Sequence, residues 1–366
     1  MNILLDNIIF SLQKSGGISV YWFEIMSNIL KQFYTTTFFV EENKPVENLF
    51  RDQLIIDNTQ IVENNNKLLH YFSRYRTIKI KNRNEQFIFH SSYYRTLNKS
   101  VKKNNQVREV VTVHDYTYER FSSGPKKWVH SWQKNKAIAA ADVVICISEN
   151  TKKDLLHFSP QFSSKDIRVI YNGVSSDYYK ILEASSDSSN PFFLFVGSRT
   201  SYKNFDFAVK AVASLDNYHL KIVGGQLSHK EIQLLDNYLK GRWTYLGIIS
   251  NIELNICYNA AFALLYPSSY EGFGIPLVEA MKAGCPFIAL QCSSITEVAG
   301  NAGFLMNTLS IDQFKEGVAF IQAKRDEIIE KGLQQSHLYS WDKCYAEVVA
   351  IYKELYKELT INKENK

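Results

Sequence analysis

Short apolar runs alternate along this chain with longer segments whose apolar residues recur at helical spacing. Runs of strand length bounded by polar turns predict buried strands, and strands that alternate with helices predict parallel sheets covered on both faces. We therefore expect an α/β protein with doubly wound parallel sheets. The apolar runs lie at 2–5, 86–89, 110–113, 142–147 and 167–171 in the first half, and at 192–197, 218–225, 244–247, 261–267 and 285–290 in the second.

The alternation is interrupted by the polar, serine-rich stretch 181–190, which has no core pattern. We predict a linker at 179–190 between two domains, 1–178 and 191–340, and such a division suits a chain of 366 residues. Helical spacing near the end predicts that 341–366 holds a final helix packing back across the domains. Open parallel sheets bind ligands at the carboxyl ends of their strands, so a cleft faced by both domains is the expected site.

Composition narrows the class of protein. Hydrophobic residues make up 45% of the chain and charged residues 22%, as in globular proteins. No apolar run approaches the roughly 20 residues that span a bilayer. The apolar start carries Asp6 rather than a basic leader, so it predicts a buried first strand rather than a secretion signal. The five cysteines are scattered without a C-x-x-C pair, which argues against a disulfide framework or a zinc site, and we expect a cytoplasmic protein.

The charge is modest overall but uneven. A net charge of +5 is too small to predict nucleic-acid binding, and we expect none. The stretch 67–108, however, holds eleven basic residues against one acid, Glu85. It is either an ordinary solvated face or a surface for an anionic partner such as phospholipid headgroups.

The stretch 261–284 carries the most specific chemistry. After a buried strand comes a loop containing Gly272 and Gly274, and Pro276 suits the opening of a helix that Gly284 ends. Backbone N–H groups of such a loop, together with the positive N-terminus of the helix, predict an anion site.

Two glutamates belong to this stretch. Glu271 precedes the helix, and Glu279 is expected in its first turn. A carboxylate at either place can accept two hydrogen bonds from a sugar diol. The plainer alternatives are compensation of the helix dipole by Glu279 and an exposed loop acid at Glu271.

The spacing of these glutamates, within EGFGIPLVEAM, resembles the E-x7-E motif of family-4 retaining glycosyltransferases (Glycosyl transferases group 1). Other recurring stretches of that family are resembled, in the same order, by SGGIS at 15–19, TVHD at 112–115, CISENTKKDL at 146–155, YNGV at 171–174 and FVGSRTSYKNF at 195–205. The resemblance implies a GT-B fold, in which two Rossmann-like domains face a cleft. The first strand is not followed by G-x-G-x-x-G, which counts against a nicotinamide dehydrogenase.

The same stretches supply the candidate site. Glycines after a buried strand let a phosphate approach the backbone at Gly16 and Gly17. Arg199 and Lys203 follow the first strand of the second domain and would stabilise a leaving diphosphate. His114, at a strand end, could bond a sugar or transfer a proton, or be a satisfied core histidine. The candidates are catalytic His114, Arg199, Lys203 and Glu271, and donor-binding Gly16, Gly17, Gly197, Ser198, Gly272, Phe273, Gly274, Ile275 and Glu279. The stretch 90–95 is a further candidate, for the acceptor pocket.

The resemblance implies a retaining glycosyltransferase, and we expect it to move a sugar from a UDP-, GDP- or dTDP-sugar to a hydroxyl of a glycan or lipid-linked glycan. By resemblance, its pathway is bacterial surface polysaccharide or lipopolysaccharide assembly, with peripheral contact with an anionic membrane as an option. No Asp-x-Asp motif occurs, so fixed cations are expected to replace a divalent metal, and no cofactor is expected. A nucleotide-sugar epimerase, a phosphorylase-like enzyme and a catalytically silent scaffold are the alternatives. Nucleotide release with and without acceptor separates the epimerase and the scaffold from a transferase.

Overall fold

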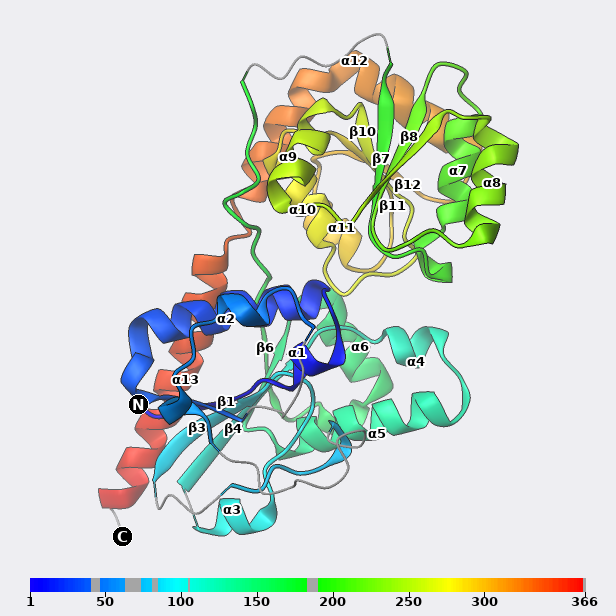
Figure 1. Cartoon of the computed structure of the whole chain (residues 1–366). Helices are drawn as coiled ribbons and strands as arrows, with labels where there is room; N and C mark the ends of the chain where they lie inside the picture. The colour runs from blue at the N-terminus through cyan, green and yellow to red at the C-terminus, as the bar shows by residue number, and fades with distance from the viewer. Residues whose placement is uncertain (41–46, 63–73, 81–84, 105, 183–189, 365–366) are drawn as a thin grey trace. The chain divides into compact units, whose positions relative to one another are not determined.

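The chain divides into two compact units, each with its own sheet (Figure 1). The computed structural model describes residues 1–40, 47–62, 74–80, 85–104, 106–182 and 190–364. Unit 1 consists of Met1–Asn172 and Trp341–Lys366, and unit 2 of Gly173–Ser340. Residues 183–189 of the predicted linker lie outside the described residues.

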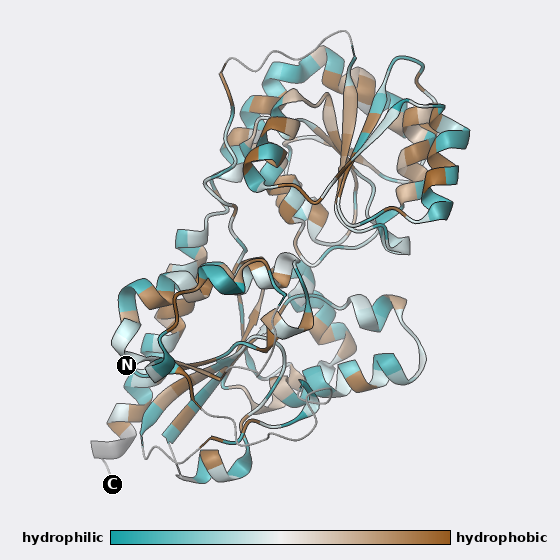
Figure 2. Cartoon of the chain, in the orientation of Figure 1, coloured by the Kyte–Doolittle hydropathy of each residue, from teal (hydrophilic) through white to brown (hydrophobic). Residues whose placement is uncertain are grey.

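Unit 1 is built on a six-stranded parallel sheet with the order β2-β1-β3-β4-β5-β6. Its strands are β1 (Ile3–Asp6), β2 (Thr37–Val40), β3 (Gln86–Ser91), β4 (Gln106–Val113), β5 (Val143–Cys146) and β6 (Asp166–Val169). The central strands are buried apolar runs, which is the pattern expected of parallel strands covered on both faces. Figure 2 shows the strands of both sheets mostly in the hydrophobic colour.

The helices of unit 1 cover this sheet. They are α1 (Ile8–Leu12), α2 (Gly17–Phe33), α3 (Lys99–Asn104), α4 (Thr117–Phe121), α5 (Gly124–Ala140), α6 (Glu149–Phe158) and the final α13 (Trp341–Glu364). Helix α13 packs on α2, β3 and β4, and its buried face, from Trp341 through Tyr352 to Leu359, joins the core that Trp22 and Ile88 belong to. The last helix of the chain therefore completes the core of the first unit.

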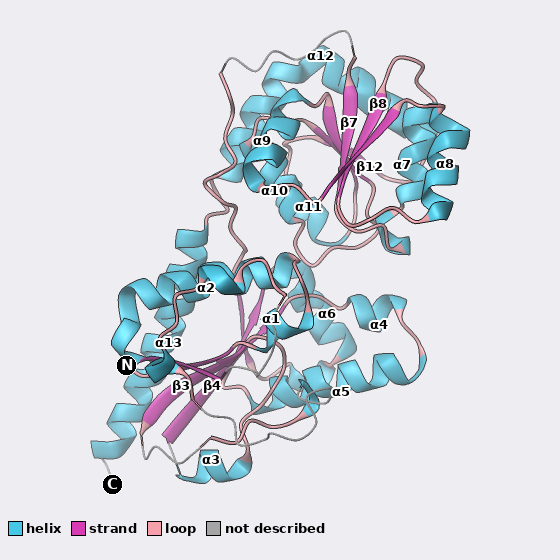
Figure 3. Ribbon diagram, in the orientation of Figure 1, coloured by secondary structure: helices cyan, strands magenta, loops and turns pink. Residues whose placement is uncertain are grey.

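Unit 2 repeats the plan with the order β12-β11-β10-β7-β8-β9, again parallel throughout. Its strands are β7 (Phe192–Val196), β8 (His219–Val223), β9 (Trp243–Gly247), β10 (Ala263–Tyr266), β11 (Phe287–Leu290) and β12 (Phe304–Met306). Its helices are α7 (Phe205–Ala213), α8 (His229–Leu239), α9 (Asn251–Ala260), α10 (Ile275–Lys282), α11 (Ser293–Ala299) and α12 (Ile311–Ser336). Figure 3 shows helices on both faces of each sheet, and the prediction of doubly wound parallel sheets is confirmed.

The strand order of unit 2 creates a switch point between β7 and β10. From β7 the chain runs outward to β8 and β9, then returns to place β10 on the other side of β7. The loops that leave the carboxyl ends of these two neighbours must diverge, and such a point is where open α/β sheets bind ligands. Within the described residues, no helix is long and apolar enough to cross a membrane.

Candidate functional site

A lysine and a glutamate meet at the switch point of unit 2. Lys203 ends a single 3-10 turn, Ser201–Lys203, that follows β7, and Glu271 lies in the loop that follows β10. Lys203 Nζ donates to Glu271 Oε1 at 2.6 Å, and both side chains are largely buried. The structure thus brings together two residues that lie 68 positions apart in the chain and that the sequence pattern had assigned to one site.

Hydrogen bonds from Asn204 and Ser269 also join the two loops. Asn204 takes a left-handed conformation, with φ 51° and ψ 45°, which turns its amide toward the β10 loop. Its Nδ2 donates to the Pro267 carbonyl at 2.8 Å and to Ser269 Oγ at 2.6 Å. In return, Ser269 N donates to the carbonyl of Tyr202 at 2.7 Å. These bonds fix the position of the backbone from which Lys203 extends.

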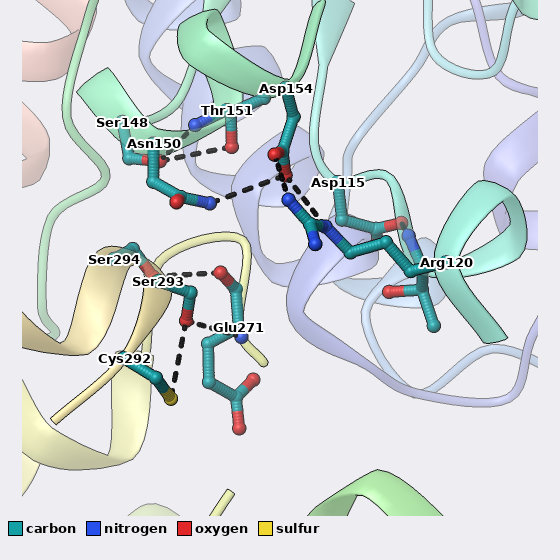
Figure 4. A network of polar contacts seen from close by, with 11 residues as sticks. Asp115, Arg120, Ser148, Asn150, Thr151, Asp154, Glu271, Cys292, Ser293 and Ser294 are labelled. Atoms are coloured by element: carbon teal, nitrogen blue, oxygen red, sulfur yellow. Dashed lines mark hydrogen bonds and ion pairs between the residues drawn. The ribbon is translucent and has the colours of Figure 1, made fainter. Parts of the chain in front are cut away.

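Helix α11 holds the other end of the β10 loop. Ser293 Oγ accepts from the N–H of Glu271 at 3.0 Å, and Ser294 Oγ bonds the carbonyls of Glu271 and Phe273, each at 2.9 Å. In Figure 4 the backbone of Glu271 faces these serines while its side chain extends away from them. Gly274, at φ 103°, then turns the chain into α10 in a conformation that a side chain would disfavour.

Glu279 lies further along α10 than expected. The helix begins at Ile275, so Glu279 is its fifth residue and lies beyond the first turn, which corrects the first-turn prediction. Tyr258 Oη donates to Glu279 Oε2 at 2.9 Å. Burial raises the pKa of Glu279 to about 7, although hydrogen bonds from Tyr258 and Tyr178 favour the charged form. A carboxyl group with this pKa is close to half protonated at neutral pH.

Arg199 is held by its own unit. Its Nε donates to Glu231 Oε1 at 2.8 Å, and its Nη2 donates to the carbonyls of Gly225 and Gln226, both at 2.7 Å. The side chain is 7% exposed, and its buried Nη1 has no hydrogen-bond partner within the described parts of the chain. Arg199 therefore ties the loop after β7 to the loop after β8.

The backbones of these two loops lie unusually close. A Cβ added to Gly224 would lie 2.4 Å from the carbonyl oxygen of Gly197, so position 224 has no room for a side chain. Gly197 has φ 121°, in the region that favours glycine. The next donor-binding candidate, Ser198, is exposed.

In unit 1 the glycine candidates lie between α1 and α2, and His114 directly follows β4. Gly16 precedes α2, where its carbonyl accepts from Ser19 Oγ at 2.9 Å, and Gly17 is the first residue of that helix. His114 is 5% exposed, lies edge-on to Tyr21 at 5.0 Å between ring centroids, and its Nε2 has no hydrogen-bond partner among the described residues. Burial lowers the pKa of His114 to about 4, so its imidazole is neutral at pH 7.

The stretch 90–95 does not form an acceptor pocket. His90 is fully buried, with Nδ1 at 2.6 Å from Tyr352 Oη and Nε2 at 3.0 Å from Thr112 Oγ1. Arg95 is buried against Asp6 in an ion pair. These polar residues satisfy one another inside unit 1, which corrects the prediction that they line a pocket.

A second polar network follows β5. Ser148 caps α6 by accepting from the N–H of Thr151 at 3.0 Å, and Asp154, on the same helix, pairs with Arg120 and accepts from Asn150 (Figure 4). The network fixes the first turns of α6, which explains the polar composition of CISENTKKDL in local terms. Within the described ranges, no group of three or more His, Cys, Asp or Glu residues is arranged to hold a metal ion.

Sequence reasoning missed several residues that shape the site. Asn204, Ser293 and Ser294 act on the loops through their amide and hydroxyl groups, and Tyr258 acts on Glu279 from a different helix. Only Asn204 has a local signal, because asparagine tolerates the left-handed conformation before a helix. The Tyr258 contact spans 21 positions and has no periodicity that would reveal it.

Comparisons with known proteins divide the chain between residues 178 and 181, a few residues beyond the boundary of the two units at 172–173. The family described as Glycosyltransferase Family 4 matches residues 15–178, and that described as Glycosyl transferases group 1 matches residues 181–335. Among curated proteins, O-antigen chain mannosyltransferase B of Escherichia coli is 25% identical over 67% of this chain and 70% of its own length. O-antigen chain mannosyltransferase RfbU of Salmonella typhimurium is 33% identical over 49% of this chain and 50% of its own length.

Solved structures show the fold. Sucrose-phosphate synthase from Thermosynechococcus elongatus superposes with a TM-score of 0.74 at 17% identity, over 98% of this chain and 100% of that one. WaaG, a glycosyltransferase involved in lipopolysaccharide biosynthesis, superposes with a TM-score of 0.67 at 14% identity, over 96% of this chain and 99% of that one. The two sheets are those of the GT-B fold.

Glu279 makes a prediction about stability that does not depend on any ligand. Its pKa is about 7 in the folded protein against an ordinary 4.5, so the folded state keeps a proton that the unfolded chain has lost. The carboxyl group's contribution to the free energy of unfolding therefore falls as pH rises from about 4.5 to about 7. Because a glutamine amide does not titrate, we expect Glu279→Gln to raise the melting temperature over wild type more at about pH 8 than at about pH 5.

The control is Glu253→Gln. Glu253 caps the exposed start of α9, and hydrogen bonds from Ser250 lower its pKa, so its carboxylate stabilises the protein above that pKa. Thermal melts of both variants should give shifts of opposite sign at the higher pH. If Glu279→Gln changes the melting temperature equally at both pH values, the pKa of this carboxyl group is not raised in the folded protein.

Proposed function

The chain belongs to the glycosyltransferase families that match it, and from this premise we propose that it transfers a sugar, with retention, from a nucleotide-diphosphate donor to a hydroxyl acceptor without a divalent metal. The observation that carries the proposal is the contact between Lys203 and Glu271 across the β7–β10 switch point. A cation and a carboxylate placed there suit a ligand that is anionic at one end and rich in hydroxyl groups at the other.

The donor binds unit 2 in this proposal. Glu279 accepts hydrogen bonds from the ribose hydroxyls and Glu271 from the sugar. The backbone of Gly272, Phe273, Gly274 and Ile275, which enters the N-terminus of α10, contacts sugar hydroxyls or phosphate. Lys203 and the Nη1 of Arg199 stabilise the diphosphate as charge develops on it, and Gly197 and Ser198 line the same loop.

Transfer with retention proceeds by attack on the face that the leaving group departs from. The acceptor oxygen forms its bond to the anomeric carbon while the bond from that carbon to the phosphate oxygen breaks. The acceptor proton passes to the leaving phosphate oxygen, so no protein base is needed. This route suits the neutral state of His114, because an imidazole with a pKa of about 4 can share a hydrogen bond at pH 7 but is not the imidazolium that would act as a general acid.

We assign acceptor binding to unit 1, where His114, directly after β4, is the catalytic candidate. Gly16 and Gly17, at the start of α2, remain candidates for binding the donor phosphate. Two relatives are named as O-antigen chain mannosyltransferases, which supports a hexose donor, mannose among the first to test, and a glycan or lipid-linked glycan acceptor. We place the enzyme in bacterial surface polysaccharide assembly, at the cytoplasmic face of the membrane, where a lipid-linked acceptor would be presented.

The two halves of the donor site are expected to respond differently to substitution. Lys203 meets charge that grows during the reaction, so Lys203→Ala should lower kcat by about 10²–10³. Glu279 meets a ribose that changes little, so Glu279→Gln should mainly raise the donor KM. Steady-state kinetics on both variants would measure kcat and the donor KM, and NMR would read the anomeric configuration of the product. The control is Lys210→Ala, which removes an exposed lysine on α7.

The opposite pattern would reverse these roles. If Glu279→Gln abolishes turnover while Lys203→Ala only raises the donor KM, the glutamate and not the lysine acts in the transition state. A product of inverted configuration would contradict same-face transfer.

Metal independence has its own test. Because Lys203 and Arg199 supply the positive charge in this proposal, transfer should continue at an unchanged rate in excess chelator. The assay is product formation with and without EDTA, with added Mg²⁺ or Mn²⁺ as the reference. Activity lost in chelator and restored by either ion would overturn the proposal that fixed cations replace a metal.

A further inference from the structure

Tyr266 is a buried tyrosine at the switch point of unit 2 that no step of the proposed function uses. It is the last residue of β10, and it is 2% exposed. Its hydroxyl has no hydrogen-bond partner among the described residues. A buried hydroxyl without a partner costs free energy, so its presence needs a reason in the fold or in a ligand.

The parts of unit 2 that form the candidate donor site meet around the ring of Tyr266. Lys203 Nζ, which extends from the loop after β7, lies 5.5 Å from the ring centroid. A Cβ added to Gly274, at the turn into α10, would lie 3.9 Å from Cε1 of the same ring. Burial, and next the charge of the nearby Glu271 carboxylate, raise the pKa of Tyr266 well above its ordinary value. The phenol therefore lies where the cation, the carboxylate and the start of α10 converge.

The fold of unit 2 does not by itself explain this hydroxyl. A phenylalanine would fill almost the same volume without burying an unpaired O–H. Two other buried tyrosines of unit 2 do use theirs, since Tyr258 Oη donates to Glu279 at 2.9 Å and Tyr178 Oη donates to Asn251 at 3.2 Å. The hydroxyl of Tyr266 thus points to a state of the site in which a ligand is bound.

Donor binding would change the surroundings of Glu271. In the proposed function the diphosphate draws Lys203 away, and the carboxylate of Glu271 loses the cation that donates to it at 2.6 Å. The Glu271 side chain is 11% exposed, so water restores little of what is lost, and a buried charge without its partner is strongly destabilising. A phenolic O–H beside the carboxylate is a donor that can take the place of the ammonium.

We propose that Tyr266 is a positioning residue: when a nucleoside diphosphate engages Lys203, the Tyr266 hydroxyl donates to the carboxylate of Glu271 in place of the lysine. The inference rests on the proposed function, because it needs a ligand whose diphosphate engages Lys203. Each group keeps or gains a partner in this exchange, since Lys203 passes from the carboxylate to the diphosphate and the phenol acquires the partner it lacks. The carboxylate stays charged and fixed, and its remaining lone pairs accept from the sugar hydroxyls.

Calorimetric titration of wild type and Tyr266→Phe with UDP, GDP, ADP and dTDP tests the exchange. The substitution removes one oxygen and keeps the ring beside Lys203. Without ligand, the variant should melt at the wild-type temperature or above it, because it loses an unpaired buried hydroxyl. Its affinity for the diphosphate that wild type binds most tightly should fall about tenfold, as expected for the loss of a hydrogen bond to a charged group. A free diphosphate is the sharper probe because it brings no sugar hydroxyls to Glu271.

A double-mutant cycle with Glu271→Ala tests whether Tyr266 acts through the glutamate. Once the carboxylate is absent, the hydroxyl has no group to support. Adding Tyr266→Phe to Glu271→Ala should therefore change the affinity for the diphosphate by less than about twofold. Thermal melts of all the variants would show that they are folded.

Steady-state kinetics give a second measure that a merely structural role would not produce. The phenol supports bound donor and transition state alike, so Tyr266→Phe should raise the donor KM about tenfold and leave kcat within about twofold. The matched control is Tyr218→Phe, which removes a hydroxyl that accepts from Gln322 at the amino end of β8, away from the switch point. It should behave as wild type does in both assays.

The outcomes separate this inference from the proposed function. If none of the four diphosphates binds wild type, the proposed function fails and the inference falls with it. If a diphosphate binds and Lys203→Ala weakens it, but Tyr266→Phe binds as wild type does, the inference alone is overturned. It is also overturned if Tyr266→Phe weakens binding equally with and without Glu271, which would make the phenol a direct contact of the nucleotide. A melting temperature of Tyr266→Phe well below that of wild type without ligand would give the hydroxyl a structural role in the free protein and would overturn it as well.

Discussion

The ion pair between Lys203 and Glu271 is the contact on which the arrangement of the two loops at the switch point of unit 2 depends. It closes across the one place where the strand order of the sheet forces two loops apart. Both charges are largely buried, so each depends on the other to offset the loss of hydration. The loops must therefore be held close, which is what the amide of Asn204 on one side and the serines of α11 on the other accomplish. In the proposed function, a bound donor would replace this ion pair with a contact from Lys203 to the diphosphate and a contact from Glu271 to the sugar.

Much of this arrangement could be predicted from the sequence, because the strands are buried apolar runs and the glutamate motif follows the strand beside β7. The order of strands then places Lys203 and Glu271 together without any knowledge of their side chains. Two short strands, β2 and β12, were missed, because β2 follows α2 after a single 3-10 turn and β12 has only three residues. The partner of Arg199 was not foreseeable either, because Glu231 reads in the sequence only as the capping residue of its own helix.

Buried polarity has a different role in each unit. In unit 2 desolvation raises the pKa of the Glu279 carboxyl group to about 7, which costs stability as the pH rises toward that value. In unit 1 the buried polar groups of α5 are engaged in part: Lys134 donates to the carbonyl of Asp115 and to Glu119, whereas Nδ1 of His130 and Oε1 of Gln133 have no hydrogen-bond partner among the described residues. His90 and Tyr352 form a second buried polar contact in unit 1, and their hydrogen bond fixes the final helix to the first sheet.

Calorimetric titration with UDP, GDP, ADP and dTDP would test most directly the claim that the Lys203–Glu271 switch point is a nucleotide-sugar site. The account predicts that at least one of these diphosphates binds the full chain, and that binding weakens about tenfold or more in Lys203→Ala, since one charged hydrogen bond is worth about 1.5–3 kcal/mol. Lys210→Ala should bind as wild type does. Binding that is indifferent to Lys203, or the absence of binding by all four nucleotides, would contradict it.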